Sequence, residues 1–151
     1  LLSFSAGFSR SSTAAGESNR NANLSLNFKP SARLTLSSGP EWTDNATVAQ
    51  YVKSVDDATA RDTFGGRYVF GELEQTEWSI PLRVNLVLTP RLSLQLYTQA
   101  LLSTGDYPTI RELAAPRTYD FPVYGGDVGT IARDPVLPLY DIDPDGAGEP
   151  G

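Results

Sequence analysis

The sequence predicts an all-β chain: an antiparallel up-and-down meander that forms a fragment of a transmembrane β-barrel with long extracellular loops. Several segments alternate apolar and polar residues at a period of two, which places the large apolar side chains on one face of a strand. A hairpin pattern occurs twice, at residues 24–36 and 84–94, with Pro in the turn and a second strand that opens Arg-Leu-Ser/Thr-Leu. The connections alternate between long and short, as in barrels with short periplasmic turns and long outer loops.

The first half of the chain contains four strand candidates. Residues 2–9 and 22–29 alternate cleanly, and their apolar faces consist of Leu2, Phe4, Ala6, Phe8 and of Leu24, Leu26, Phe28. A short turn at residues 29–32 contains Pro30, whose fixed φ suits a turn. Residues 33–38 then continue the pattern. Gly39-Pro40 predicts a bulge or a bend, and residues 46–53 form a less apolar strand.

The second half contains the longest strand candidates. Residues 67–88 form one strand, whose first part carries several Glu residues and whose second part is apolar on one face. Pro81 within it indicates an edge strand or a bulge, because Pro cannot donate to a ladder. Thr89-Pro90-Arg91 turns the chain, and residues 92–103 return with the same alternation. Arg83 lies on the polar face, where a partner such as Glu77 or a neighbouring strand is expected.

Three segments have the composition of loops. Residues 10–21 and 54–66 are rich in Ser, Asn, Gly and charged residues. From residue 104 the alternation disappears, although a short helical turn near residues 109–114 fits the sequence. We therefore predict two regions: 1–103, the antiparallel barrel strands and hairpins, and 104–151, a long irregular loop with an incomplete barrel before it.

One stripe of the second hairpin is predicted to face lipid. Its members share one face of residues 78–88 and 92–96: Trp78, Ile80, Leu82, Val84, Leu86, Leu88, Leu92, Leu94 and Leu96. A strand crosses a bilayer in about 9–11 residues, and this apolar part is long enough. A soluble antiparallel sheet with one face packed on a core gives the same alternation. The alternating connections, Trp78 at one border and the uncharged polar face favour the barrel.

Composition restricts the chemistry. The chain has no Cys and no His, which excludes disulfides, thiolate metal sites and the commonest general base. Its net charge of −6 argues against nucleic acid as a partner. No apolar run is long enough for a transmembrane helix. Because the 151 residues contain no Met and begin within a strand pattern, we interpret them as an internal piece of a longer protein.

Two carboxylate patterns could carry chemistry. Glu72 and Glu74 lie on one strand face, roughly 6–7 Å apart, a spacing that overlaps the acid pair of an inverting glycosidase. A solvated outer segment of a strand is the favoured explanation, and no catalytic residue is assigned. The sequence Asp141-Ile-Asp143-Pro-Asp145-Gly resembles the opening of a calcium loop. Its twelfth position would lie past residue 151 and Pro144 is atypical, so an acidic Gly/Pro loop is the alternative.

Aromatic residues form a third group. They could form an interfacial girdle, stack on sugars or simply pack in the loops. The group consists of Trp42, Tyr97, Tyr107, Tyr119, Phe121, Tyr124 and Tyr140.

Residues 67–107 resemble a known family. The segments that carry the resemblance are Arg67-Tyr-Val-Phe-Gly-Glu-Leu-Glu-Gln-Thr-Glu-Trp-Ser, Leu82-Arg-Val-Asn, Leu88-Thr-Pro-Arg-Leu-Ser-Leu-Gln-Leu-Tyr and Ser103-Thr-Gly-Asp-Tyr. They are similar to the C-terminal outer-membrane β-barrel domain, a domain of unknown function, of bacterial proteins with an N-terminal domain like carbohydrate-binding module family nine. The resemblance implies an outer-membrane location and a role near saccharides. It supplies no catalytic residues.

These observations lead to one expected function and two alternatives. The chain is expected to be a segment of a bacterial outer-membrane β-barrel that acts as the anchor or pore of a carbohydrate-associated surface protein. Its expected partners are outer-membrane lipid, the remainder of the same barrel and a saccharide, without a cofactor or nucleic acid. The first alternative is a soluble antiparallel β glycan-binding module. The second is an enzyme that uses Glu72 and Glu74, although we expect no enzymatic activity.

Overall fold

The chain is all-β, as predicted, and its long strands form an antiparallel meander. A computed structural model describes residues 1–137 and 139–146. Within these residues the only helical segment is a 3₁₀ turn at Arg61–Thr63. The chain divides into two units. Unit 1 consists of Leu1–Thr47 and Glu74–Asp106, and unit 2 consists of Val48–Leu73 and the chain from Tyr107 onward.

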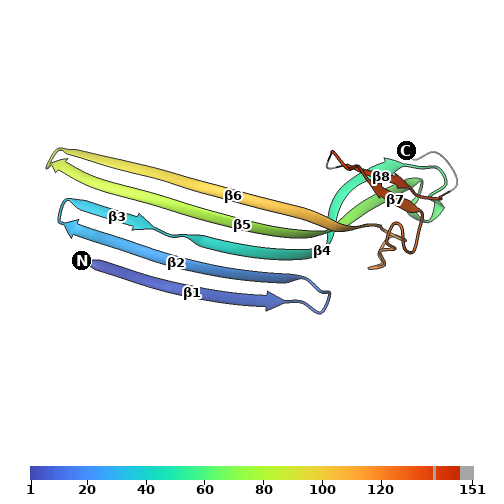
Figure 1. Ribbon diagram of the computed structural model, residues 1–151, viewed down its shortest axis with the longest axis horizontal. Coiled ribbons are helices and arrows are strands. Elements are labelled where there is room, and N and C mark those ends of the chain that lie inside the picture. The colour runs from blue at the N-terminus through green and yellow to red at the C-terminus, as the bar shows by residue number, and fades with distance from the viewer. Residues whose placement is uncertain (138, 147–151) are drawn as a thin grey trace. The chain divides into compact units, whose positions relative to one another are not determined.

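The described residues contain eight strands, and Figure 1 labels them in chain order. Three of the long strands, β4, β5 and β6, contribute residues to both units. The strands are β1 (Leu2–Ser12), β2 (Ser18–Ser31), β3 (Leu34–Ser38), β4 (Glu41–Asp56), β5 (Gly66–Thr89), β6 (Leu92–Glu112), β7 (Thr130–Arg133) and β8 (Tyr140–Asp143).

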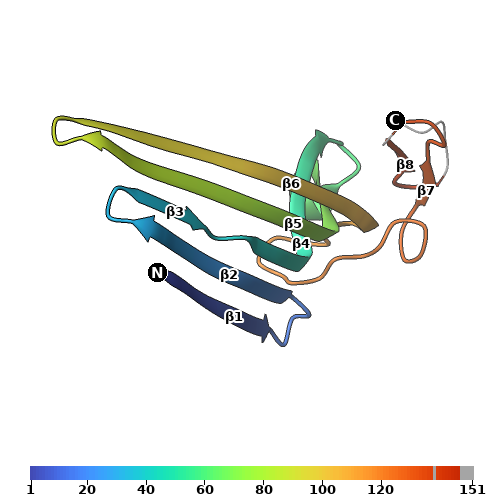
Figure 2. The same cartoon turned by 60° about the vertical axis from the view of Figure 1, so that its left-hand side comes forward.

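Unit 1 is a sheet in which strands that follow each other in sequence are also neighbours. β1 pairs with β2, and β2 pairs with β3 and then with β4. β5 pairs with β3 and β4 on one side and with β6 on the other. β3 and β4 therefore share one position between β2 and β5, and Figures 1 and 2 show the same order from two directions.

The predicted bend at Gly39-Pro40 is an interruption rather than a bulge. Asn23 pairs with Glu41 and Leu26 pairs with Ser38, so both strands advance by the same three positions and no residue is inserted. Pro81 lies nearby in β5, with its Cγ 3.7 Å from the position of a Cβ on Gly39. β5 is flanked on both sides, so Pro81 is not on an edge strand. Its missing donor coincides with the break between β3 and β4, and the Ser38 hydroxyl donates to its carbonyl at 2.7 Å.

Backbone pairing extends several strands beyond their alternating parts. The expected polar loop at residues 10–21 is wrong: β1 and β2 continue pairing to Ser12 and Ser18, and only residues 13–17 connect them. This connection is short, so the expected alternation of long and short connections does not hold there. Ladder hydrogen bonds join main-chain groups, so Ser, Asn and Arg can extend a strand without apolar alternation.

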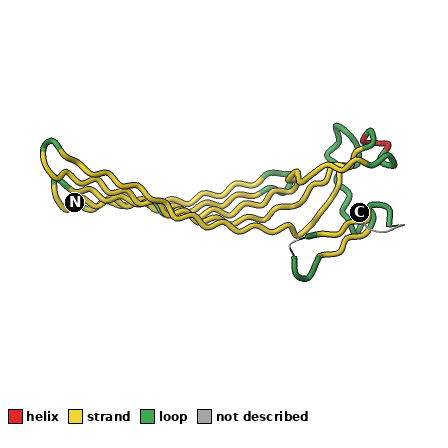
Figure 3. Tube along the Cα trace, turned by 90° about the horizontal axis from the view of Figure 1, so that it is seen from above, coloured by secondary structure: helices red, strands yellow, loops and turns green. Residues whose placement is uncertain are grey.

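The region after residue 103 also contains more regular structure than expected. β6 continues to Glu112, so the helical turn near residues 109–114 is wrong, and β7 and β8 form an antiparallel pair. The first Pro turn is shifted as well: Ser31 pairs with Leu34 after a register shift that begins at Phe28, so Pro30 lies within β2. The second turn lies at residues 90–91, as predicted. Figure 3 shows the β2–β3 and β5–β6 turns as short loops between long strands.

The small core of the chain lies in unit 2. Val69, Ile110 and Tyr124 are buried, and five partly buried side chains pack against them: Tyr107, Val128, Ile131, Tyr140 and Ile142. These residues come from β5, β6, the segment before β7, and the β7–β8 pair. Gly129 has a φ of +52°, and a Cβ there would lie 2.2 Å from the carbonyl oxygen of Asp143. A glycine is therefore required where the chain enters β7.

Candidate functional site

The apolar face of unit 1 is continuous across its strands. Register places Leu34 opposite Leu86 and Leu36 opposite Val84, so the stripes of β3 and β5 lie on the same face. The nine residues predicted to face lipid lie in β5 and β6. Seven of them are 40–56% exposed: Trp78, Ile80, Leu82, Leu88, Leu92, Leu94 and Leu96. The other two, Val84 and Leu86, are half-buried.

Strands β1 and β2 extend this face beyond the residues chosen from the sequence. Leu2 pairs with Phe28, and Phe4 pairs with Leu26. Phe28 in turn pairs with Leu36, which completes a row from β1 to β5. All 80 residues of unit 1 lie in the part of the chain that the structure describes, and none of them is buried. The apolar face therefore has no protein core beneath it.

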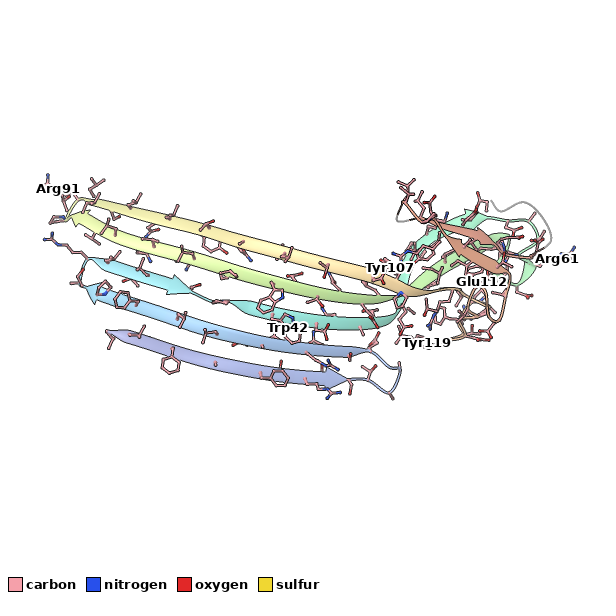
Figure 4. All side chains as sticks on the ribbon, viewed as in Figure 1. Trp42, Arg61, Arg91, Tyr107, Glu112 and Tyr119 are labelled. Carbon is pink, nitrogen blue, oxygen red and sulfur yellow. The ribbon has the colours of Figure 1, made fainter. Side chains whose placement is uncertain are left out.

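A tryptophan pair and an ion pair mark one border of the apolar face. The rings of Trp42 on β4 and Trp78 on β5 lie 6.4 Å apart, and Figure 4 labels Trp42. Arg20 and Asp44 pair in register two residues further along the same face, with an N–O distance of 3.6 Å. Thr76 adds a hydrogen bond to Asp44 at 3.3 Å. The face thus changes within one residue pair from aromatic to charged.

The opposite face of unit 1 is polar and carries a network of side-chain hydrogen bonds. Asn21 donates to Thr43 at 3.0 Å and to Glu41 at 2.6 Å, and Asn19 donates to Asn45. On β5 and β6, Gln99 donates to Ser79 at 2.7 Å and Gln75 donates to Ser103 at 3.1 Å. Such a face can line water or hold polar solutes, because its amides and hydroxyls offer both donors and acceptors.

Arg83 is the one charged side chain of the polar face between Trp78 and the β5–β6 turn. Its guanidinium carbon lies 5.5 Å from the ring centroid of Tyr97 on β6. The partner of Arg83 is therefore on the neighbouring strand, one of the two expected positions, and the contact is a cation–π contact and not an ion pair with Glu77.

Unit 2 contains a charged network that the sequence does not reveal. Arg67 on β5 donates through Nε to Asp57 and through Nη1 to Glu112 on β6, the latter at 2.9 Å. Burial alone would lower the pKa of Arg67, but the hydrogen bonds to Asp57 and Glu112 raise it above its ordinary value. The guanidinium is 14% exposed and the Glu112 carboxylate 12% exposed. The network ties the loop after β4 to both neighbouring strands.

Two further groups complete this network. The Thr59 hydroxyl and amide both donate to Asp57, at 2.6 and 2.8 Å. The Thr59 hydroxyl, Arg67 and the Thr59 amide together lower the pKa of Asp57 to about 2. The Tyr124 hydroxyl donates to Glu112 at 2.6 Å. Burial and the neighbouring Glu112 carboxylate raise the pKa of Tyr124 well above its usual range, so it stays a neutral donor.

A cavity of about 400 Å³ lies beside this network in unit 2. Its size falls in the range of small-molecule sites. Lys53, Asp56, Asp57 and Arg67 are its charged members, and the others are mainly apolar: Val52, Val55, Val69, Ile110, Tyr124, Leu139, Tyr140, Ile142 and Pro144. The donors of Arg67 are already used within the protein, so the cavity offers mainly apolar contact.

An exposed row of aromatic rings lies elsewhere in unit 2. Tyr51 contacts Phe70 edge to face at 5.7 Å, Phe70 contacts Phe121 at 5.0 Å, and Phe121 contacts Tyr119 at 5.1 Å. Tyr51 and Tyr119 at the two ends are 50% and 65% exposed. Three other tyrosines of the predicted aromatic group belong to the core: Tyr107, Tyr124 and Tyr140. The group therefore divides into Trp42 beside Trp78, Tyr97 under Arg83, the core members and this row.

Neither carboxylate pattern gains support as a site from the described residues. Glu72 accepts a hydrogen bond from Arg111 at 3.3 Å, so it belongs to an ion pair. Asp141 and Asp143 lie in β8, and Asp143 accepts from the Gly146 amide at 3.0 Å. Across residues 1–137 and 139–146, no three acidic side chains are grouped to hold a metal ion. The calcium candidate Asp141, Asp143 and Asp145 thus gains no support.

Among the same residues, no helix is both long and apolar enough to cross a membrane. Comparison of the chain with models of known families, with curated proteins and with solved structures finds no match.

Proposed function

We propose that unit 1 is a segment of a bacterial outer-membrane β-barrel, which serves as the anchor or pore of a surface protein. The observation that carries the proposal is a continuous apolar face on a single sheet without any buried residue. The nine side chains predicted to face lipid are about half exposed. Complete burial of these side chains would contribute a further stabilisation on the order of 10 kcal/mol. A typical domain has a net stability of only about 5–15 kcal/mol. Something apolar must therefore cover this face, and hydrocarbon is the proposed cover.

Two details favour lipid over another protein layer. The apolar residues of β5 from Trp78 to Leu88 span a length of about one membrane strand. The Trp42–Trp78 pair stands where the face becomes charged, as aromatic residues do at membrane interfaces. The uncharged amide and hydroxyl groups of the opposite face suit a water-filled lumen.

Closure requires additional strands. The described strands occupy five positions across the sheet, whereas small barrels have about eight strands. β1 pairs only with β2, and β6 pairs only with β5, within the part of the chain that the structure describes. We propose that the remainder of the same barrel covers these two edges. The resemblance of residues 67–107 adds an association with carbohydrate to the proposal.

Detergent dependence tests the membrane proposal. Full-length protein should be extracted from bacterial outer membranes only with detergent, and it should migrate differently on gels before and after boiling. A monodisperse monomer in buffer without detergent would contradict the proposal and favour the soluble module.

Glycan binding is a second candidate function, because the row Tyr51, Phe70, Phe121 and Tyr119 ends in two exposed rings. Tyr51→Ala and Tyr119→Ala should each weaken retention of the full-length protein on a polysaccharide gel. Tyr68→Ala is the matched control, since Tyr68 is also exposed but lies outside the row. Equal retention of all three variants would exclude this role for the row.

A further inference from the structure

The charges of unit 1 are distributed unevenly along its strands. Residues 22–40 and 78–103 contain four of the twelve Lys and Arg residues of the chain and none of its eighteen Asp and Glu residues. Three of these cations lie at the two short turns: Lys29 and Arg33 at the β2–β3 turn, and Arg91 at the β5–β6 turn. All three are exposed. The fourth, Arg83, is held over Tyr97 on the polar face.

The fold brings the two turns to the same end of the sheet. Ser31 pairs with Leu34, and Leu34 pairs with Leu86 across the β3–β5 ladder. The Val87 amide donates to the Arg33 carbonyl at 2.8 Å, so the ladder continues up to the turn. Figure 4 shows Arg91 at the tip of the neighbouring turn, beside this end of β3. The three cations therefore gather at one end of the apolar face.

The opposite end of the apolar face has a different character. Beyond Trp42 and Trp78 the first charged groups are the paired Arg20 and Asp44, together with Arg10 of β1, which is in register with Arg20. Glu41 and Glu77 line a small hollow on the polar side nearby. Acidic groups of this sheet thus begin at Glu41, next to the tryptophan border, and unpaired cations occur at the turns. An apolar face with a cationic rim at one end matches a lipid layer whose head groups are anionic.

From this distribution we infer that Lys29, Arg33 and Arg91 form a cationic rim that binds the phosphates of anionic phospholipid head groups in the leaflet at the short turns. This inference rests on the proposed membrane insertion of unit 1. Long Lys and Arg side chains can keep their stems on apolar surface while their charges reach head groups. Basic residues at an anionic membrane surface each add measurable affinity, and salt screens the effect. The short turns keep the three charges close to the end of the hydrocarbon band.

Refolding into vesicles of defined composition tests the rim. Full-length protein is diluted from denaturant into neutral phosphatidylcholine vesicles or into vesicles with roughly 20% phosphatidylglycerol added, and the inserted fraction is measured from its heat-modifiable band. The wild type should need about tenfold less lipid for half-insertion when phosphatidylglycerol is present. The difference should vanish in about 1 M salt, where the Debye length is about 3 Å.

A variant with Lys29→Gln, Arg33→Gln and Arg91→Gln should insert into neutral vesicles like the wild type and lose the gain from phosphatidylglycerol. The matched control changes three exposed arginines outside the rim: Arg10→Gln, Arg61→Gln and Arg117→Gln. It has the same net charge and should keep the gain. Equal behaviour of the two triple variants would overturn the rim.

Other results separate the rim from the membrane proposal itself. Insertion into neutral and anionic vesicles with the same efficiency would overturn only the rim. If lipid A increases the inserted fraction more than phosphatidylglycerol does, the assignment to phospholipid is overturned. The turns would then lie in the other leaflet. Failure to insert into any vesicle would contradict the membrane proposal, and the rim with it.

Discussion

No residue of unit 1 is buried, whereas unit 2 contains every buried side chain of the described residues. In unit 1 the strands carry an apolar face on one side and amides and hydroxyls on the other. In unit 2, portions of β5 and β6 and the chain from Tyr124 to β8 contribute the core around Val69, Ile110 and Tyr124, and Arg67 pairs with Glu112 beside it. Strands of one meander thus carry two kinds of surface.

This difference shows what organises each unit. Unit 2 buries Val69, Ile110 and Tyr124 and pairs Arg67 and Arg111 with carboxylates inside the unit. Unit 1 pairs its backbone and its polar face, but none of the side chains of its apolar face is buried. Under the proposed function, hydrocarbon supplies the missing apolar contacts, and substitutions in the two units should therefore have different consequences in lipid and in water.

The largest effect should come from a charge in the middle of the apolar face. Val84→Arg is expected to destabilise the full-length protein folded in phospholipid vesicles by about 2–4 kcal/mol, since the arginine would lie near the centre of the bilayer. Leu88→Arg, on the same face but next to the turn, should cost only about 0–1 kcal/mol. Denaturant titration in vesicles measures both.

Asn85→Arg provides the opposite-face control for this prediction. Asn85 neighbours Val84 in β5 but points to the polar face, so the substitution should have little effect. If Val84→Arg and Leu88→Arg lower the free energy of unfolding by the same amount, the medium that covers the apolar face does not change with depth. The face would then resemble a protein interior, and the contrast between the units would be lost.

Substitution of Arg67 should cause the next largest loss of stability, and the loss should be confined to unit 2. Arg67→Met leaves Asp57 and Glu112 without their partner. Breaking a fully buried pair costs about 3–5 kcal/mol. Because these groups are partly exposed, we expect roughly 2 kcal/mol. Amide hydrogen exchange should accelerate at Val69 and Ile110 and remain unchanged at Leu26 and Leu36.

Exchange that accelerates equally in both sets of amides would show that the two units unfold as one. In that case the division between them describes packing only and has no energetic meaning.

The extent of β5 could be predicted from the sequence, and the ends of several other strands could not. Residues 67–88 match β5 to within one residue at each end, because β-branched and apolar residues alternate up to a Pro turn. β1, β2 and β6 extend through Ser, Asn, Gly and charged residues. There the ladder depends on the neighbouring strand, which a local pattern does not reveal.

Of the candidate site, only the part with a residue pattern that repeats along a strand could be predicted from the sequence. The apolar stripe from Trp78 to Leu96 is periodic, so its members share a face as expected. The network of Asp57, Arg67 and Glu112 joins positions 10 and 45 residues apart. The sequence Asp57-Ala-Thr59 is the one local signal, since an Asp can accept from the residue two positions later. It indicates a turn without indicating that Arg67 lies beside it.

A smaller effect is expected from the tight packing of unit 2. A Cβ on Gly71 would lie 2.5 Å from Cδ1 of Tyr107 and 3.4 Å from Ile110. Gly71→Ala should therefore destabilise unit 2 by about 1 kcal/mol, at the low end of overpacking costs because the ring can shift. Gly39→Ala is the control in unit 1, where the nearest atom to the new Cβ is 3.7 Å away. Thermal unfolding of both variants measures the difference, and equal losses would remove the packing contrast.

The smallest effect should be a local pH dependence of unit 2. The hydrogen bonds from the Thr59 hydroxyl, Arg67 and the Thr59 amide lower the pKa of Asp57 from 3.8 to about 2. Because the folded pKa is lower than the unfolded one, the ionised carboxylate stabilises the loop after β4 at every pH above about 4. This contribution should disappear as the pH falls through about 2. Exchange at the Thr59 and Ala60 amides should accelerate across that window in the wild type and stay constant in Asp57→Asn.

Asp134 is the internal comparison. Hydrogen bonds from the Leu137 and Val136 amides also lower the pKa of Asp134, so acid should loosen residues 134–137 in both the wild type and Asp57→Asn. Acceleration at Thr59 that persists in Asp57→Asn would assign the acid response to another group.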